Sequence, residues 1–185
     1  MSGCSTPHLV TVRHLVIVGG EDPSTTDELA AILRDTCTVR TAYSTPEVLD
    51  RLEPDVDVVL VDPGLGEDAV ETVRDAVAGR ELDCQFGVLS TGTDDRTDDD
   101  IRVSVAASER DFRERVEQLA TRARYRKTLE EYYELVQASA ELRAEDLPAQ
   151  RDQAHRRLEA LGRRLDDAAA PLDAEALFRA VLDDE

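Results

Sequence analysis

The sequence lacks tryptophan, and aromatic residues of all kinds make up only 4% of the chain. A hydrophobic core must therefore be built from Val, Leu, Ile and Ala. No apolar run approaches the roughly 20 residues that a membrane-spanning helix requires. Residues 1–11 have neither the basic segment nor the apolar segment of a signal peptide. We therefore expect a cytoplasmic protein that does not enter a membrane.

Cysteine and histidine are scarce, with three residues of each type. The cysteines form no CxxC pair, their odd number does not suit a disulfide framework, and the histidines share no metal-ligand spacing. The residues concerned are Cys4, Cys37, Cys84, His8, His14 and His155. No GxGxxG or Walker motif is present either. These absences predict a protein that is not an enzyme and has no metal site built from His and Cys.

Lysine is almost absent, since Lys127 is the only one among the 22 basic residues. The 41 acidic residues give a formal net charge of −19 and are spread along the whole chain. This composition is typical of proteins adapted to molar salt, where the Debye length of about 3 Å screens self-repulsion. The alternative is an acidic protein that binds cationic partners, but the even spread of acids favours the halophilic interpretation.

Between His14 and Arg122, short apolar runs alternate with amphipathic stretches. This alternation predicts an α/β fold, a doubly wound five-stranded parallel sheet with helices on both faces. The strands are expected at residues 15–18, 38–42, 57–61, 85–89 and 101–105. Helices are expected at 25–35 with Thr25 as N-cap, from Thr45, at 68–78, and after a Ser108 cap. Residues 91–100 contain no apolar residue and cannot bury a helical face, so the fourth helix is predicted to be short, frayed or absent.

The pattern becomes purely helical after Arg122. One long helix is expected at 124–145, and Pro148 separates it from a second helix at 149–169. The second helix has a stripe close to a heptad seam, formed by Ala154, Leu158, Leu161, Leu165 and Ala168. Asp173 is predicted to cap a short last helix. These helices form either a self-contained α-helical hairpin or a seam for a protein partner or a second copy, and the small core of a hairpin favours association.

Polar and small residues follow the predicted strands at their carboxyl ends, where open α/β sheets place their sites. Gly19, Gly20, Glu21 and Asp22 follow the first strand, Asp62 the third, Ser90 the fourth, and residues 105–106 the fifth. We expect these positions to lie at one edge of the sheet.

The stretch CTVRTAYSTPEVLDRLEPDVDVVLVDPGLGEDAVE, residues 37–71, resembles the receiver domain of two-component response regulators. It is similar to receivers of haloarchaeal regulators that carry a C-terminal HalX-type module. The stretch RARYRKTLEEYYELVQASAELRAE, residues 122–145, resembles the start of HalX. The resemblance implies a tail at 1–13, a receiver of flavodoxin-like type at 14–122 and a HalX-like module at 123–185. It also implies a sensor histidine kinase as partner.

The resemblance implies roles for two residues. Asp62 aligns with the phosphoaccepting aspartate of the family, and Ser90 aligns with its switch hydroxyl. The acidic pair that holds Mg²⁺ in the family aligns with Gly19 and Gly20 instead. The family's lysine aligns near residues 104–106, where the nearest cation is Arg102.

These replacements predict a degenerate receiver, because phosphoryl transfer to a carboxylate needs Mg²⁺ and a cation to offset the gathered negative charge. No cofactor is therefore expected. Mg²⁺ would bind only if Glu21 and Asp22 replaced the missing pair beside Asp62. The structural alternative is that Asp62 caps the loop at Pro63 and Gly64.

The sequence therefore favours a non-catalytic signalling protein that acts without phosphorylation, through a helical output or dimerisation module. One alternative is a response regulator switched by phosphorylation of Asp62, and another is a DNA-binding transcriptional regulator. Residues 113–127 and 150–164 are rich in arginine, but interleaved acids suggest salt-bridged helix faces. No helix-turn-helix signature is found, so DNA is a disfavoured partner.

Overall fold

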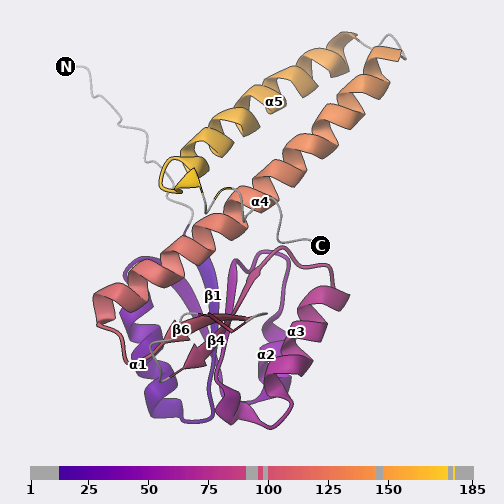
Figure 1. The fold of residues 1–185 in the computed structure, drawn as a ribbon. Helices are drawn as coiled ribbons and strands as arrows, with labels where there is room; N and C mark the ends of the chain where they lie inside the picture. The colour runs from indigo at the N-terminus through magenta and orange to yellow at the C-terminus, as the bar shows by residue number, and fades with distance from the viewer. Residues whose placement is uncertain (1–12, 91–95, 98–99, 145–147, 175–176, 178–185) are drawn as a thin grey trace, which may run out of the picture.

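The computed structural model describes residues 13–90, 96–97, 100–144, 148–174 and 177. They form a sheet-containing core from which a two-helix arm projects (Figure 1). The strands are β1 (His14–Gly19), β2 (Cys37–Ala42), β3 (Val58–Val61), β4 (Gln85–Ser90), β5 (Arg96–Thr97) and β6 (Asp100–Ser104). The helices are α1 (Pro23–Leu33), α2 (Thr45–Arg51), the 3-10 helix η1 (Pro63–Leu65), α3 (Ala69–Gly79), α4 (Glu109–Ala144) and α5 (Pro148–Ala169).

The strand order in the sheet is β2-β1-β3-β4-β6-β5. Strands β1, β2, β3, β4 and β6 pair in parallel, so the predicted doubly wound five-stranded parallel sheet is confirmed. The short β5 pairs antiparallel with β6 at the edge, and this additional strand was not predicted. It lies in the interval where a shortened helix was expected. Residues 91–95 and 98–99 of that interval lie outside the described residues.

Helices cover both faces of the sheet (Figure 1). On one face, α1 and α4 pack over Val16, Val18, Val58 and Leu60. On the other face, α2 and α3 pack over Ile17, Val59 and Val61. Every residue of β3 is buried, as expected for a central strand of a parallel sheet that is covered on both sides. The two cores use aliphatic side chains almost throughout, which agrees with the scarcity of aromatic residues.

The helix starts follow from short polar side chains. Asp22, not Thr25, is the N-cap of α1, so that prediction is wrong by one turn. Pro23 occupies the first turn, where its missing N–H leaves no hydrogen bond unmade. Ser44 caps α2, and the predicted cap Ser108 accepts a hydrogen bond from Asp111 N at 3.2 Å at the start of α4.

Helix α4 is continuous from the core into the arm. Two separate helical stretches were predicted on either side of residues 122–124, but they form one helix of 36 residues. Its N-terminal half packs on the sheet, and α5 returns antiparallel to its C-terminal half (Figure 1). The predicted last helix lies mostly outside the described residues, although Leu177 N donates to Asp173 O at 3.0 Å. None of the described helices combines the length and apolar composition that a membrane span needs.

Candidate functional site

The carboxyl ends of the parallel strands meet at one edge of the sheet, as predicted. The strand register pairs Gly19 with Val61 and Val61 with Val88. Asp62 therefore lies beside Gly20, and its backbone N–H donates to Gly19 O at 2.8 Å. Ser90 ends the neighbouring strand β4 at the same edge. The structure thus brings together the positions that the resemblance assigned to a phosphoacceptor and a switch hydroxyl.

The carboxylate of Asp62 is used locally. Its Oδ1 accepts a hydrogen bond from Gly64 N at 2.8 Å, and Asp62 is the N-cap of η1. This is the loop-capping geometry that the sequence offered as the structural alternative for Asp62. The side chain is half-buried. A capping role accounts for an aspartate at this position without any phosphoryl chemistry.

Gly19 and Gly20 are tightly packed, which limits the room for larger acidic side chains at these two positions. A Cβ atom on Gly20 would lie 2.3 Å from Thr26 Oγ1, and a Cβ atom on Gly19 would lie 2.7 Å from Val48 Cγ2. Thr26 is buried, and its hydroxyl donates to Asp22 O at 2.8 Å. The first turn of α1 therefore occupies the space beside Gly20 that a side chain would need.

The two acids that follow the glycines do not complete a metal site with Asp62. The Asp22 carboxylate accepts hydrogen bonds from Thr25 Oγ1 at 2.6 Å, Thr25 N at 3.1 Å and Ser24 N at 3.3 Å. These bonds, foremost that from the Thr25 hydroxyl, hold the pKa of Asp22 below its ordinary value. Glu21 is exposed. Within the described residues, no group of three or more His, Cys, Asp or Glu side chains could hold a metal ion, so these residues do not fit the Mg²⁺ site of a receiver.

The end of β6 offers no cation at the position of the family's lysine. Ser104 pairs with Ser90 in the register, and its buried Oγ has no hydrogen-bond partner in the described structure. Lys127, the only lysine of the chain, lies instead at the opposite edge of the sheet.

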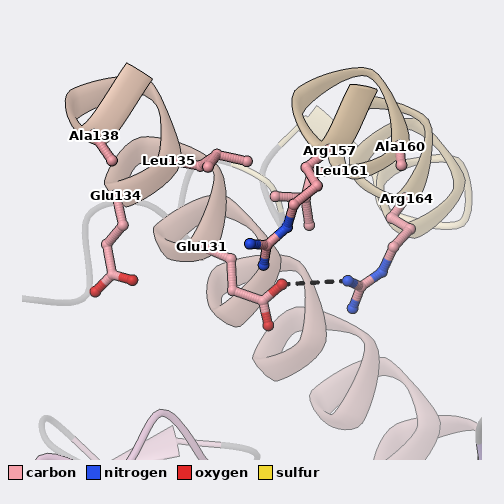
Figure 2. A pocket seen from close by; sticks show the side chains of 8 residues that line it. All are labelled: Glu131, Glu134, Leu135, Ala138, Arg157, Ala160, Leu161 and Arg164. Atoms are coloured by element: carbon pink, nitrogen blue, oxygen red, sulfur yellow. Dashed lines mark hydrogen bonds and ion pairs between the residues drawn. The ribbon is translucent and has the colours of Figure 1, made fainter. Parts of the chain in front are cut away.

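The arm presents a groove between α4 and α5 (Figure 2). Its volume is about 600 Å³. Apolar side chains form its floor, with glutamates on the α4 side and arginines on the α5 side. Its lining residues are Glu131, Glu134, Leu135, Ala138, Arg157, Ala160, Leu161 and Arg164. An ion pair between Glu131 Oε2 and Arg164 Nη1, 3.2 Å long, joins the two helices at one end.

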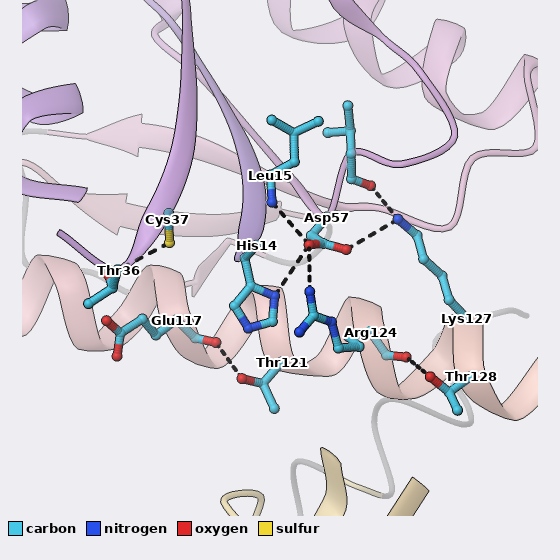
Figure 3. Close-up of polar contacts among 11 residues, drawn as sticks. His14, Leu15, Thr36, Cys37, Asp57, Glu117, Thr121, Arg124, Lys127 and Thr128 are labelled. Atoms are coloured by element: carbon cyan, nitrogen blue, oxygen red, sulfur yellow. Dashed lines mark hydrogen bonds and ion pairs between the residues drawn. The ribbon is translucent and has the colours of Figure 1, made fainter. Parts of the chain in front are cut away.

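A buried charged cluster lies at the amino ends of the strands (Figure 3). Asp57, only 5% exposed, precedes β3. Its Oδ2 accepts a hydrogen bond from Leu15 N at 3.1 Å and lies 3.3 Å from His14 Nδ1. Two cations of α4 reach the same carboxylate: Lys127 Nζ lies 3.3 Å from Oδ1, and Arg124 Nη2 lies 3.9 Å from Oδ2.

Burial opposes the ionisation of Asp57, but the His14 hydrogen bond and the Lys127 charge outweigh it and lower the pKa of Asp57 below its ordinary value. The carboxylate is therefore ionised near neutral pH. The sequence analysis missed this cluster, because Lys127 is 70 residues away in the chain and Asp57 reads as the first residue of a strand. The one available signal was that a chain depleted of lysine keeps a single lysine.

Comparison with solved structures decides the fold. A response regulator receiver domain protein from Bacillus halodurans aligns over 58% of this chain and 97% of that structure, with a TM-score of 0.50. The core has the receiver fold. Sequence identity in this alignment is 13%, so the likeness concerns the receiver fold alone.

Sequence comparison gives a relative of known description. A putative transcriptional regulator from Haloferax volcanii is 32% identical over 138 residues. The match covers 65% of this chain but only 23% of the relative, so the chain corresponds to less than a quarter of that protein. No protein-family profile matches the sequence.

Proposed function

We propose that the chain is a non-catalytic signalling protein in which the receiver fold acts without aspartyl phosphorylation. The receiver would serve as a scaffold for the arm, and the arm would contact a protein partner or a second copy. The observation that carries this proposal is the packing at Gly20, where the Thr26 hydroxyl occupies the place of a Mg²⁺-binding side chain.

The electrostatics of phosphoryl transfer support this proposal. An incoming phosphoryl group brings several negative oxygens to the Asp62 carboxylate, and Mg²⁺ with a neighbouring cation normally offsets that charge. Among the described residues, Asp22 caps a helix and Glu21 faces solvent, and the only lysine of the sequence lies at the other edge of the sheet. The remaining role of Asp62 is to cap η1.

Treatment with acetyl phosphate and Mg²⁺ in molar KCl, followed by intact-mass measurement, tests the proposal. We expect no gain of one phosphoryl mass in the wild type. Asp68→Asn, which alters an exposed acid of the same loop, serves as a matched control for non-specific modification. A phosphoryl adduct that persists in Asp68→Asn and disappears in Asp62→Asn would defeat the proposal and favour a phospho-switched regulator.

The proposal assigns residues 14–122 to a degenerate receiver and residues 123–185 to a HalX-like module. The continuity of α4 across residues 122–123 supports a mechanical connection between them. A shift in the receiver would be transmitted along a hydrogen-bonded helix rather than through a flexible linker. A sensor histidine kinase is not required for this connection.

A second candidate function is transcriptional regulation through DNA, which the similarity to the Haloferax transcriptional regulator favours. The arginines on α5 would supply phosphate contacts. A gel-shift assay across a KCl series tests this candidate, because DNA affinity falls steeply as salt rises. A sequence-specific shift in molar KCl would favour DNA binding over the scaffold proposal.

A further inference from the structure

We propose that Asp57 is the centre of an ionic latch that sets the direction of the arm. In the closed state, the Asp57 carboxylate holds Arg124 and Lys127 of α4 against the amino edge of the sheet (Figure 3). In the open state, these contacts are lost and the arm swings relative to the receiver. The inference rests on the arm being the interaction element of the proposed function, but it does not depend on the phosphorylation state of Asp62.

The latch lies where α4 leaves the core. Ala123 is fully buried, and the next turn of the helix carries the two cations that reach Asp57. Lys127 Nζ also donates to Val56 O at 2.6 Å, so Lys127 bonds both the backbone and the carboxylate at this edge. The buried apolar cluster on this face of the sheet ends at Ala120. At the root of the arm, residues 124–127, charged contacts therefore replace apolar packing between α4 and the receiver.

A neighbouring ion pair supports the same root. Arg126 Nε lies 3.6 Å from Asp83 Oδ1, and both side chains are about three-quarters buried. Successive residues of one helical turn therefore face acids from two different loops of the receiver. This arrangement fixes the rotation of α4 about its own axis as well as its tilt.

Burial makes the latch two-state. A carboxylate as buried as Asp57 is stable only while it is paired, because an unpaired charge in the interior carries a large desolvation penalty. Loss of the α4 cations therefore requires water to reach Asp57, and intermediate positions of the arm are disfavoured. His14 of β1 and the backbone N–H of Leu15 hold the carboxylate in place on the receiver side.

The same burial protects the latch from salt. Exposed ion pairs are weakened by screening in molar salt, whereas buried pairs are screened much less. The arm's Glu131–Arg164 pair has both side chains more than half exposed. In concentrated salt, Asp57 therefore keeps control of the arm root while surface pairs of this kind lose strength. A partner that binds the arm in one position would select between the two states of the latch.

Distance measurement by pulsed electron paramagnetic resonance tests the latch. Spin labels are attached at Glu71→Cys on α3 and Asp152→Cys on α5, both exposed positions, in a Cys4→Ser background. Burial raises the pKa of the Cys37 thiol and raises that of Cys84 to about 11, so these native thiols label slowly near neutral pH. We expect one narrow distance distribution with the native latch. Asp57→Asn and Lys127→Met are each expected to shift or broaden it by several ångströms.

Glu53→Gln is the matched control, because it removes the exposed Arg40–Glu53 pair without altering α4. It should leave the distance distribution unchanged. The single lysine provides an independent readout by acylation and peptide mass. Lys127 should react slowly in the wild type and about tenfold faster in Asp57→Asn, because reaction requires the open state.

Circular dichroism establishes that each variant is folded. If Asp57→Asn does not fold, Lys127→Met tests the latch by itself, and Lys127→Arg should restore the narrow distribution. Unchanged distances in folded Lys127→Met would overturn the latch. Such a result would leave the acetyl-phosphate experiment unaffected, so failure of the latch is distinguishable from failure of the proposed function.

Discussion

At the scale of single residues, two glycines show that the effect of a substitution depends on the space around the residue rather than on its type. A Cβ on Gly20 would meet Thr26 Oγ1 at 2.3 Å, whereas a Cβ on Gly162 in α5 would meet no atom within 4 Å. Gly20 is therefore held by packing between β1 and α1. No packing contact in the described structure requires a glycine at position 162. A glycine inside a helix increases the conformational entropy of the unfolded chain and therefore lowers the stability of the fold.

These environments predict opposite effects of the same substitution. Gly20→Ala should lower the free energy of unfolding by about 1–3 kcal/mol, because the added methyl group overpacks the α1 contact. Gly162→Ala should raise it by roughly 0.5–1 kcal/mol through helix propensity. Urea unfolding in concentrated KCl measures both. A Gly20→Ala chain as stable as the wild type would contradict the packing account of the glycine pair.

Single residues also mark the limit of what the sequence could predict. The positions of Asp62 and Ser90 at the strand ends followed from the alternation of strands and helices. The partners of Asp57 did not, because 41 acidic residues make any one acid unremarkable before the fold is known. Contacts between residues 70 positions apart depend on where α4 crosses the sheet, and helical periodicity carries no such information.

At the scale of elements, the helix types and their order were predictable, while their joints were not. Apolar spacing located α1, α2, α3 and α5, but it divided α4 at residues 122–124. The α4 residues of the sheet-facing core extend only to Ala120, and those that line the groove with α5 start at Glu131, so the apolar pattern changes along one unbroken helix. The antiparallel β5 was missed because residues 91–100 carry no strand-like alternation.

The start of α1 gives a prediction at this scale. Asp22→Ala should lower the midpoint of thermal unfolding by a few degrees, because two backbone N–H groups of the first turn lose their acceptor. Asp22→Asn, which retains an acceptor oxygen, should recover most of the loss. The wild-type midpoint should be the same with and without millimolar Mg²⁺. A Mg²⁺-dependent rise that Asp22→Ala abolishes would indicate a metal ligand rather than a helix cap.

At the scale of the whole molecule, charge governs the conditions under which the fold persists. A net charge of −19 on 185 residues produces electrostatic self-repulsion. Concentrated salt screens this repulsion, because it shortens the Debye length to a few ångströms. Ion pairs within the chain cannot remove this excess, because 22 basic residues can match only 22 of the 41 acids and leave a net charge of −19. The composition, rather than any one contact, therefore predicts the salt requirement.

Circular dichroism and thermal unfolding between about 0.1 and 3 M KCl measure this requirement. The unfolding midpoint should rise with salt, and helical signal should be lost at the low end. Sodium chloride at equal ionic strength is the control for an effect specific to potassium. A fold whose midpoint is indifferent to KCl over this range would contradict adaptation to molar salt.

The length of α4 has a mechanical consequence. At 1.5 Å per residue, the 21 residues after Ala123 extend roughly 30 Å beyond the fulcrum at the edge of the sheet. A tilt of about ten degrees at that fulcrum would carry the far end of the helix through about 5 Å, enough to replace one set of surface contacts by another. Helix α4 thus acts as a lever that converts a side-chain rearrangement within the receiver into a displacement at the scale of an interface.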